Sequence, residues 1–168
     1  SRRPCRAAGE LARHGRLEHR LAISGIGPEQ RPPLQALAAE QGVADRLTFL
    51  PYLDERDLRS VYAGADLFVY PSRAEGWGIP VLEAMAAGLP IVSTTAGDVP
   101  YMLTDGEDAR LVAPGDGEAL GAAMAAVLAD GDAAARMGTA ARRRAEVEFP
   151  VAAMVERTAE SFRRAVET

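Results

Sequence analysis

Between residues 21 and 112, short apolar runs alternate with longer segments in which apolar residues recur at helical spacing. The runs are apolar at nearly every position, which is typical of strands buried on both faces of a parallel sheet. This pattern predicts five strands, over residues 21–24, 47–50, 67–70, 91–94 and 109–112.

The segments between these strands begin and end with capping and turn residues, as helices do. They predict helices over residues 28–41, 55–63 and 79–87, and three further helices after the last strand, over residues 116–128, 132–148 and 151–166. Repeated strand–helix–strand units predict an α/β fold with a doubly wound, Rossmann-like parallel sheet, right-handed crossovers and extra C-terminal helices. No interior boundary interrupts the pattern, so we expect residues 1–168 to form one domain.

Composition narrows the class of protein. The formal net charge of the 168 residues is -5, which argues against a general nucleic-acid binder, because such proteins carry a basic face. The single cysteine, Cys5, excludes an intrachain disulfide and fits a reducing compartment. No apolar run approaches the ~20 residues that span a bilayer. We expect a cytoplasmic protein without a nucleic-acid partner.

The chain does not begin with Met, so we also expect that it is part of a longer parent protein. Contact with a membrane would be possible only through that parent.

Ligands of open parallel sheets bind beyond the carboxyl ends of the strands, so the loops that follow the predicted strands are candidate sites. After the first strand, Gly25 and Gly27 allow the backbone to approach a ligand closely, although glycines also serve tight turns that bind nothing. After the second strand, Tyr52 and Leu53 could pack on a nucleobase. The alternative there is an ordinary turn in which Asp54 caps the next helix.

The loop after the third strand carries the most chemistry. Glu75 and Glu83 bracket the turn Gly76-Trp77-Gly78 and the start of an apolar helix at Ile79. Free N–H groups at a helix N-terminus favour an anion, and carboxylates can hold hydroxyl groups. This combination of phosphate and hydroxyl binding predicts a site for a sugar nucleotide.

Structural roles for the same side chains remain open. Glu75 could cap the following helix, and Trp77, the only tryptophan, could anchor the core, although a partly exposed ring beside a ligand is as well supported. Glu83 lies within an apolar helix, where a buried carboxylate needs a hydrogen-bonding partner. Ribose hydroxyls could supply that partner, so we favour a functional role for Glu83.

Residues 65–92, with two glutamates separated by seven residues, closely resemble the signature of the family 4 (group 1) retaining glycosyltransferases of GT-B fold. The likeness runs in order from about residue 8 to the C-terminus, and it includes the glycine turn at residues 25–28 and the strand at residues 46–50. The resemblance implies the C-terminal, donor-binding domain of a two-domain enzyme. Its partner would be an N-terminal acceptor-binding domain of the same parent chain.

The resemblance also implies a hexosyltransferase-type reaction. A nucleotide-diphosphate sugar would be the donor, the sugar would be transferred with retention, and neither a metal nor another cofactor would be needed. Glu75 would contact the transferred sugar together with N–H groups of residues 76–79, and Glu83 would hold the ribose. The loop at Tyr52 and Leu53 would meet the base, and the turn at Gly25 and Gly27 is counted among the donor-binding residues. Alone, the domain is expected to be inactive or weakly active, because it neither positions an acceptor nor excludes water.

Two features depart from the family pattern. The family places an Arg and a Lys after the first strand of this domain, where they neutralise the diphosphate, and the first twenty residues show no such strand. We therefore do not assign that role to the arginines near the N-terminus. The family's later glycine-rich segment usually ends in Glu, where this chain has Tyr101.

Two alternatives compete with this interpretation. Gly25 and Gly27 follow a strand and Asp45 lies twenty residues beyond Gly25, as in a nicotinamide dinucleotide fingerprint. However, Gln30 stands where the third glycine belongs, and Asp45 precedes its strand instead of ending it. The other alternative is a non-catalytic, GT-B-like interaction module, against which the intact glutamates and glycines argue.

Overall fold

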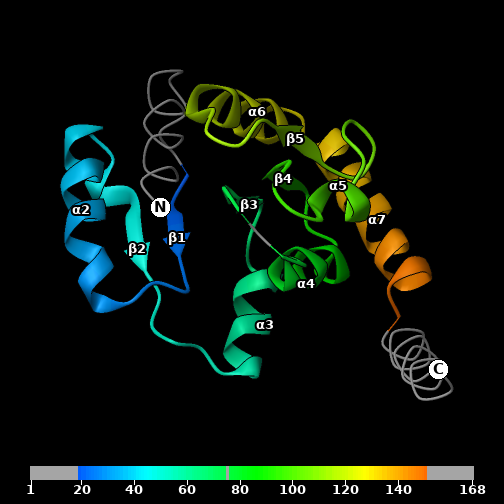
Figure 1. Ribbon diagram of the computed structural model, residues 1–168, viewed down its shortest axis with the longest axis horizontal. Helices are drawn as coiled ribbons and strands as arrows, with labels where there is room; N and C mark the ends of the chain where they lie inside the picture. The colour runs from blue at the N-terminus through cyan, green and yellow to red at the C-terminus, as the bar shows by residue number, and fades with distance from the viewer. Residues whose placement is uncertain (1–18, 75, 151–168) are drawn as a thin grey trace, which may run out of the picture.

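The computed structural model describes residues 19–74 and 76–150 (Figure 1). All five predicted strands are present: β1 (Leu21–Ile23), β2 (Leu47–Phe49), β3 (Phe68–Tyr70), β4 (Ile91–Thr94) and β5 (Arg110–Val112). The helices are η1 (Pro28–Gln30), α2 (Arg31–Glu40), η2 (Ala44–Arg46), α3 (Glu55–Ala63), α4 (Ile79–Ala87), α5 (Val99–Met102), α6 (Gly117–Ala129) and α7 (Gly131–Glu148), of which η1 and η2 are single 3-10 turns.

The helix predictions agree closely with these bounds. α3 and α4 begin and end at the predicted residues, and the helix predicted over residues 28–41 starts as η1 and continues as α2. α6 and α7 are each displaced by at most one residue from the prediction. The pattern does not predict η2 or α5, which are too short to show a helical period. The helix predicted over residues 151–166 lies outside the described residues.

The predicted α/β architecture is confirmed, with every strand pairing parallel. β1 pairs with β2, while β3, β4 and β5 pair in that order. Within the described residues these two groups are not paired with each other, so the sheet that the pattern predicts as one has two parts. Figure 1 shows β1 and β3 at the facing edges.

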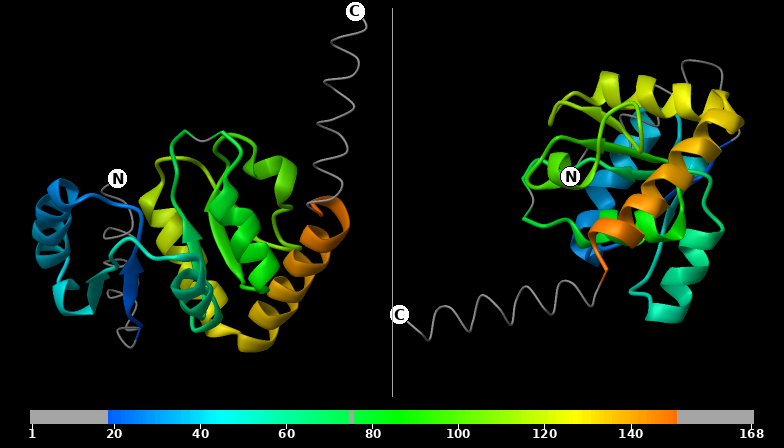
Figure 2. Two further views of the ribbon diagram at one scale, coloured as in Figure 1. Left: turned by 90° about the horizontal axis from the view of Figure 1, so that it is seen from below. Right: turned by 90° about the vertical axis from the view of Figure 1, so that its right-hand side faces the viewer.

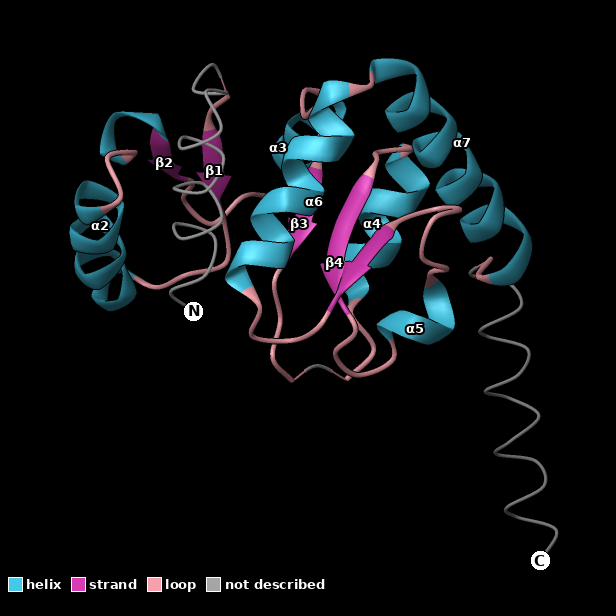
Figure 3. Ribbon diagram, turned by 90° about the horizontal axis from the view of Figure 1, so that it is seen from above, coloured by secondary structure: helices cyan, strands magenta, loops and turns pink. Residues whose placement is uncertain are grey.

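Helices cover both faces of the strands (Figures 2 and 3). Adjacent residues of β4 point to opposite faces, as the pleat requires. Ile91 packs in a buried cluster with residues of α4, α5 and α7, and Val92 packs in a second cluster with α6. A third cluster joins α2 to β1 around Ile23 and Leu37. β4 is buried at all its positions, and its first two residues, Ile91 and Val92, are apolar on opposite faces, whereas Ser93 and Thr94 are buried polar residues.

α4 and α7 pack closely where α4 ends. Gly88 closes α4 with a φ of 75°, in the left-handed region that favours glycine. Gly138 of α7 lies against it, and an added Cβ at Gly138 would meet the carbonyl oxygen of Gly88. The absence of a side chain at position 138 therefore sets how closely the two helices approach.

Within residues 19–74 and 76–150, no helix is both long enough and apolar enough to cross a bilayer.

Candidate functional site

The loop that carries the predicted glycine turn starts at the carboxyl end of β3, and neighbouring segments hold it. Thr94, at the end of β4, donates a hydrogen bond from Oγ1 to the carbonyl oxygen of Ser72 over 2.7 Å. The backbone N–H of Asp98 donates to the carbonyl oxygen of Gly76 over 3.2 Å. Sequence reasoning missed the role of Thr94. The signal that could have found it is a buried hydroxyl at the end of an apolar strand, which needs a hydrogen-bond partner.

The N-terminus of α4 opens onto this loop. Gly78 is its N-cap, with φ 72° and ψ 50°, and no side chain of the described residues caps the helix. Glycine suits this position because other residues rarely adopt a left-handed backbone. Pro80 lies in the first turn, where its missing N–H costs no hydrogen bond. The first turn of α4 therefore presents the positive end of the helix dipole to the loop.

Glu83 lies one turn into α4 and is half-buried. Tyr62 of α3 donates a hydrogen bond from Oη to Glu83 Oε2 over 2.9 Å. The sequence correctly indicated that this carboxylate needs a partner, but the partner found within the protein is a phenol from another helix. A carboxylate can accept about four hydrogen bonds, so Glu83 Oε1 can still accept one from a ligand.

Burial raises the pKa of Tyr62 well above its ordinary value, and the hydrogen bond to Glu83 and the negative charge of Glu83 raise it further. The phenol therefore keeps its proton at neutral pH and acts as the donor. Its ring also packs against Phe68 of β3, with ring centroids 5.8 Å apart. Tyr62 is thus a second residue of the site that sequence reasoning missed, because Tyr62 and Glu83 meet only when α3 packs on α4.

We expect the Tyr62→Phe variant to lose about 1 kcal/mol of unfolding free energy, because it removes the hydrogen bond to Glu83 and keeps the ring. Urea denaturation followed by circular dichroism measures the loss. Above pH ~10, the unfolded Tyr62 ionises while the folded one stays neutral, so the stability that this phenol contributes should decline there. Tyr52→Phe is the matched control, since the Tyr52 side chain is fully exposed. Equal stability of the two variants would contradict the prediction.

The other predicted donor residues lie at the ends of β1 and β2. Gly25 has a φ of 72°, so its turn requires glycine whether or not it binds a ligand. Gly27 is the N-cap of η1. Asp54 caps α3 by accepting a hydrogen bond from the N–H of Asp57, as the alternative interpretation of this loop predicts. The neighbouring Tyr52 is fully exposed and packs on nothing, while Leu53 is half-buried.

The predicted residues of the third loop are brought together at the start of α4, apart from Glu75, which lies outside the described residues. The ring of Trp77 is partly exposed, at 37%, and Ile79 is exposed at the first position of α4. Trp77 is therefore not a core anchor. Its ring contacts Tyr101 and Phe149.

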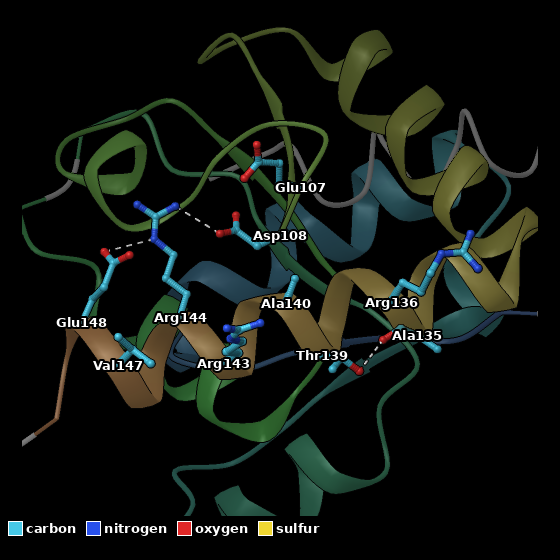
Figure 4. A pocket seen from close by; sticks show the side chains of 10 residues that line it. All are labelled: Glu107, Asp108, Ala135, Arg136, Thr139, Ala140, Arg143, Arg144, Val147 and Glu148. Carbon is cyan, nitrogen blue, oxygen red and sulfur yellow. Dashed lines mark hydrogen bonds and ion pairs between the residues drawn. The ribbon is translucent and has the colours of Figure 1, made fainter.

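A cavity of about 690 Å³ lies elsewhere, between α7 and the loop that precedes β5 (Figure 4). None of the predicted donor residues lines it. Arg144 lies on its wall and donates to Thr104 Oγ1 over 2.7 Å, to Asp108 Oδ2 over 3.1 Å and to the carbonyl oxygen of Tyr101 over 3.1 Å. These bonds attach α7 to the segment after β4. The role of Arg144 in this wall is structural.

The α/β fold places the glycine turn at the end of β3 and the N-terminus of α4 at the carboxyl ends of parallel strands, which is where open α/β sheets bind their ligands. The chain belongs to the group 1 glycosyl transferases, because the family described as "Glycosyl transferases group 1" matches residues 5–144. The resemblance given by residues 65–92 is thereby confirmed.

Individual relatives agree with the family assignment. The chain is 34% identical over 139 residues to an MMP alpha-(1->4)-mannosyltransferase of Mycolicibacterium hassiacum, covering 82% of this chain and 34% of the relative. It is 37% identical over 138 residues to a D-inositol 3-phosphate glycosyltransferase of Nocardia farcinica, covering 79% and 31%. The chain thus spans about a third of the length of these relatives.

Among solved structures, sucrose-phosphate synthase from Thermosynechococcus elongatus superposes with a TM-score of 0.86 at 27% identity, covering 99% of this chain and 43% of that one. The GT-B fold expected from the resemblance is confirmed by this likeness and by the parallel α/β architecture.

Proposed function

We propose that this chain is the donor-binding domain of a retaining glycosyltransferase. The enzyme would take a hexose from a nucleotide-diphosphate sugar and transfer it to an acceptor held by an N-terminal domain of the same parent chain. One observation carries the proposal: the helix N-terminus at Gly78, which no side chain of the described residues caps, lies one turn from a half-buried Glu83. Membership of the group 1 glycosyl transferases supports it.

The diphosphate of the donor would lie at the first turn of α4. The oriented peptide dipoles there stabilise negative charge, and that charge increases on the diphosphate as the sugar departs. In this proposal the stabilisation comes from dipoles and basic residues, without a metal or another cofactor. Thr94 and Asp98 hold the loop through its carbonyl oxygens, so its backbone N–H groups are already arranged before the donor binds.

The ribose would be held by Glu83. Tyr62 occupies Oε2 and orients the carboxylate, and Oε1 remains available to accept a hydrogen bond from a ribose hydroxyl. Glu75 would contact the transferred sugar, together with the N–H groups of Gly76 to Ile79. An ionised carboxylate only accepts hydrogen bonds, which suits the hydroxyl groups of a ribose.

The nucleobase would lie toward the ends of β1 and β2. The exposed ring of Tyr52 has an open face for stacking, and Leu53 adds apolar surface beside it. The turn at Gly25 and Gly27 would let the backbone approach the donor closely. Since these residues belong to the other part of the sheet, the donor would bridge the two parts.

Titration of the chain with nucleotide sugars tests the proposal. UDP-, GDP- and ADP-sugars are added separately up to millimolar concentration, and binding is followed by calorimetry or by NMR. Binding of at least one of them, in preference to NAD, is expected. Unperturbed spectra with every nucleotide sugar would contradict the proposal, and preference for NAD would instead favour a dinucleotide-binding domain.

Two variants then separate the proposed roles of the glutamates. We expect Glu83→Gln to weaken binding of both the nucleotide sugar and the matching nucleoside diphosphate about tenfold, because a hydrogen bond to a charged group contributes about 1.5 kcal/mol. Glu75→Gln is expected to weaken binding of the nucleotide sugar to a similar extent. It should leave binding of the nucleoside diphosphate unchanged, because in this proposal only the sugar contacts Glu75. Calorimetry with both ligands measures the difference.

Glu40→Gln is the control for these variants, because Glu40 is exposed and is the last residue of α2, the end of the helix that leads to the amino end of β2. It should bind both ligands as the unchanged chain does. If Glu75→Gln weakened the nucleoside diphosphate as much as the nucleotide sugar, the role proposed for Glu75 would be wrong. If Glu83→Gln had no effect, the role proposed for Glu83 would be wrong.

A non-catalytic interaction module of the same fold is the other candidate function, and the retained Glu75, Glu83, Gly76 and Gly78 argue against it. Sugar transfer by the parent protein, assayed with the donor that binds, separates the two possibilities.

A further inference from the structure

Three aromatic rings form a closed triangle beside the loop that precedes α4. The centroid of Trp77 lies 5.9 Å from Tyr101 and 6.0 Å from Phe149, and Tyr101 and Phe149 are 6.0 Å apart. Phe149 meets both other rings edge to face, with interplanar angles of 73° and 71°. These separations and angles are those at which aromatic pairs attract each other. We call these three residues the aromatic triad.

The triad joins three segments that are distant in the sequence. Trp77 belongs to the loop before α4, Tyr101 to α5, and Phe149 follows the last residue of α7. Backbone contacts reinforce the junction, because Asp98, the N-cap of α5, donates to Gly76 in the loop. Arg144 of α7 donates to the carbonyl oxygen of Tyr101. The loop, α5 and the end of α7 therefore form one connected unit.

Trp77 and Tyr101 are not part of the core, whereas Phe149 packs against it. Tyr101 is 59% exposed and Trp77 is 37% exposed, and neither belongs to the buried cluster beneath them. Gly76 and Gly78 on either side of Trp77 have no side chain, so the Trp77 ring is the side-chain attachment of this turn, beside the backbone bond from Asp98 to Gly76. Without that attachment a turn with two glycines would sample many backbone conformations.

We propose, on the basis of the proposed donor site, that Tyr101 and Phe149 are positioning residues that hold the Gly76–Gly78 turn in its donor-binding arrangement through Trp77. They act on the donor indirectly. The structure thereby connects the end of α7 to the loop that would carry the sugar and diphosphate contacts. Tyr101 is one of the departures from the family pattern, and its ring completes this junction.

The test uses Trp77, the only tryptophan, as a probe. Its single indole N–H resonance and its near-ultraviolet circular dichroism are recorded without ligand for the unchanged chain, Phe149→Ala and Phe149→Tyr. Val147→Ala is the matched control, since Val147 is exposed two residues earlier and is not in the triad. We expect Phe149→Ala to move both signals, whereas Phe149→Tyr, which keeps a ring, and Val147→Ala leave the indole resonance in place.

Affinity for the nucleotide sugar is then measured by calorimetry for the same variants and for Tyr101→Phe. Phe149→Ala is expected to weaken binding of the nucleotide sugar about fivefold. This is the loss of affinity expected when an aromatic contact that preorganises the loop is removed. Phe149→Tyr and Tyr101→Phe should bind normally. Far-ultraviolet circular dichroism verifies that each variant is folded, and a variant that does not fold is replaced by Tyr101→Ala.

The outcomes distinguish this inference from the proposed function. If no nucleotide sugar binds the unchanged chain, the proposed function fails, and the Trp77 signals alone decide whether the triad holds the turn. If the donor binds but Phe149→Ala changes neither the Trp77 signals nor the affinity, the positioning role is wrong. If the signals move and the affinity does not, the triad orders the turn without serving the donor, which also overturns the proposal.

Discussion

The Gly138→Ala variant is expected to lose about 3 kcal/mol of unfolding free energy, at the upper end of the usual range for overpacking a core. The added Cβ would overlap the carbonyl oxygen of Gly88, and it would also come close to backbone atoms of Leu89. Backbone cannot rotate away as the end of a side chain can, so α7 would have to move off α4. Ala141 and Ala145 of the same helix pack in the cluster beneath that contact and would move with it.

Gly131→Ala is the matched control, because Gly131 is in the same helix and an added Cβ there meets nothing within 4 Å. Alanine is the better helix former by about 1 kcal/mol, so this variant should be as stable as the unchanged chain or slightly more stable. Urea denaturation followed by far-ultraviolet circular dichroism measures both variants. Similar stability for the two would show that α4 and α7 do not depend on close contact at Gly138.

The second large effect is expected for Arg144→Met, which should also lose about 3 kcal/mol, the cost of removing one partner from a buried ion pair. The side chain of Asp108 is only 5% exposed, and Arg144 is its ion-pair partner in the described residues. Methionine keeps the apolar stem of the side chain but leaves the Asp108 charge unpaired. It also removes the bonds to Thr104 and to the Tyr101 carbonyl oxygen.

Arg142→Met, two residues earlier, separates this effect from a general loss of charge. Arg142 pairs with Glu146 at 2.9 Å, but both side chains are more than half exposed, at 59% and 63%. Such a surface pair contributes at most about 0.5 kcal/mol. Thermal or urea unfolding of both variants provides the comparison. Equal losses of unfolding free energy would mean that the burial of Asp108 does not make its ion pair more important. The double variant Arg144→Met with Asp108→Asn removes the unpaired charge, so it should recover part of the lost stability.

These two sites also bear on the proposed function. Arg144 holds the Tyr101 carbonyl oxygen, and Gly138 sets the position of α7, at whose end Phe149 lies. Both therefore support the aromatic triad and the turn beside it. The helices that follow the last strand are part of what shapes the proposed donor site, although they contribute none of its predicted contacts.

Local rules account for what could be predicted from the sequence. Ile91 and Val92 indicate their strand because a strand buried on both faces is apolar at successive positions. α3 and α4 begin and end where capping and turn residues stand, such as Asp54 and Gly88, because these satisfy backbone groups without help from distant residues. The glycines of the proposed site are likewise local, since Gly25 and Gly78 adopt a left-handed backbone. The resemblance to the family rests on the same short segments.

Contacts between distant residues could not be predicted in this way. Glu83 required a hydrogen-bond partner, but which partner it has depends on how α3 packs against α4, and Tyr62 lies 21 residues away. The division of the sheet, the pairing of Arg144 with Asp108 and the aromatic triad have the same origin. Each joins segments that nothing in the chain's local pattern places together. The sequence therefore identified the elements and the binding motif, whereas packing of the helices on the strands supplied the partners that hold the motif in place.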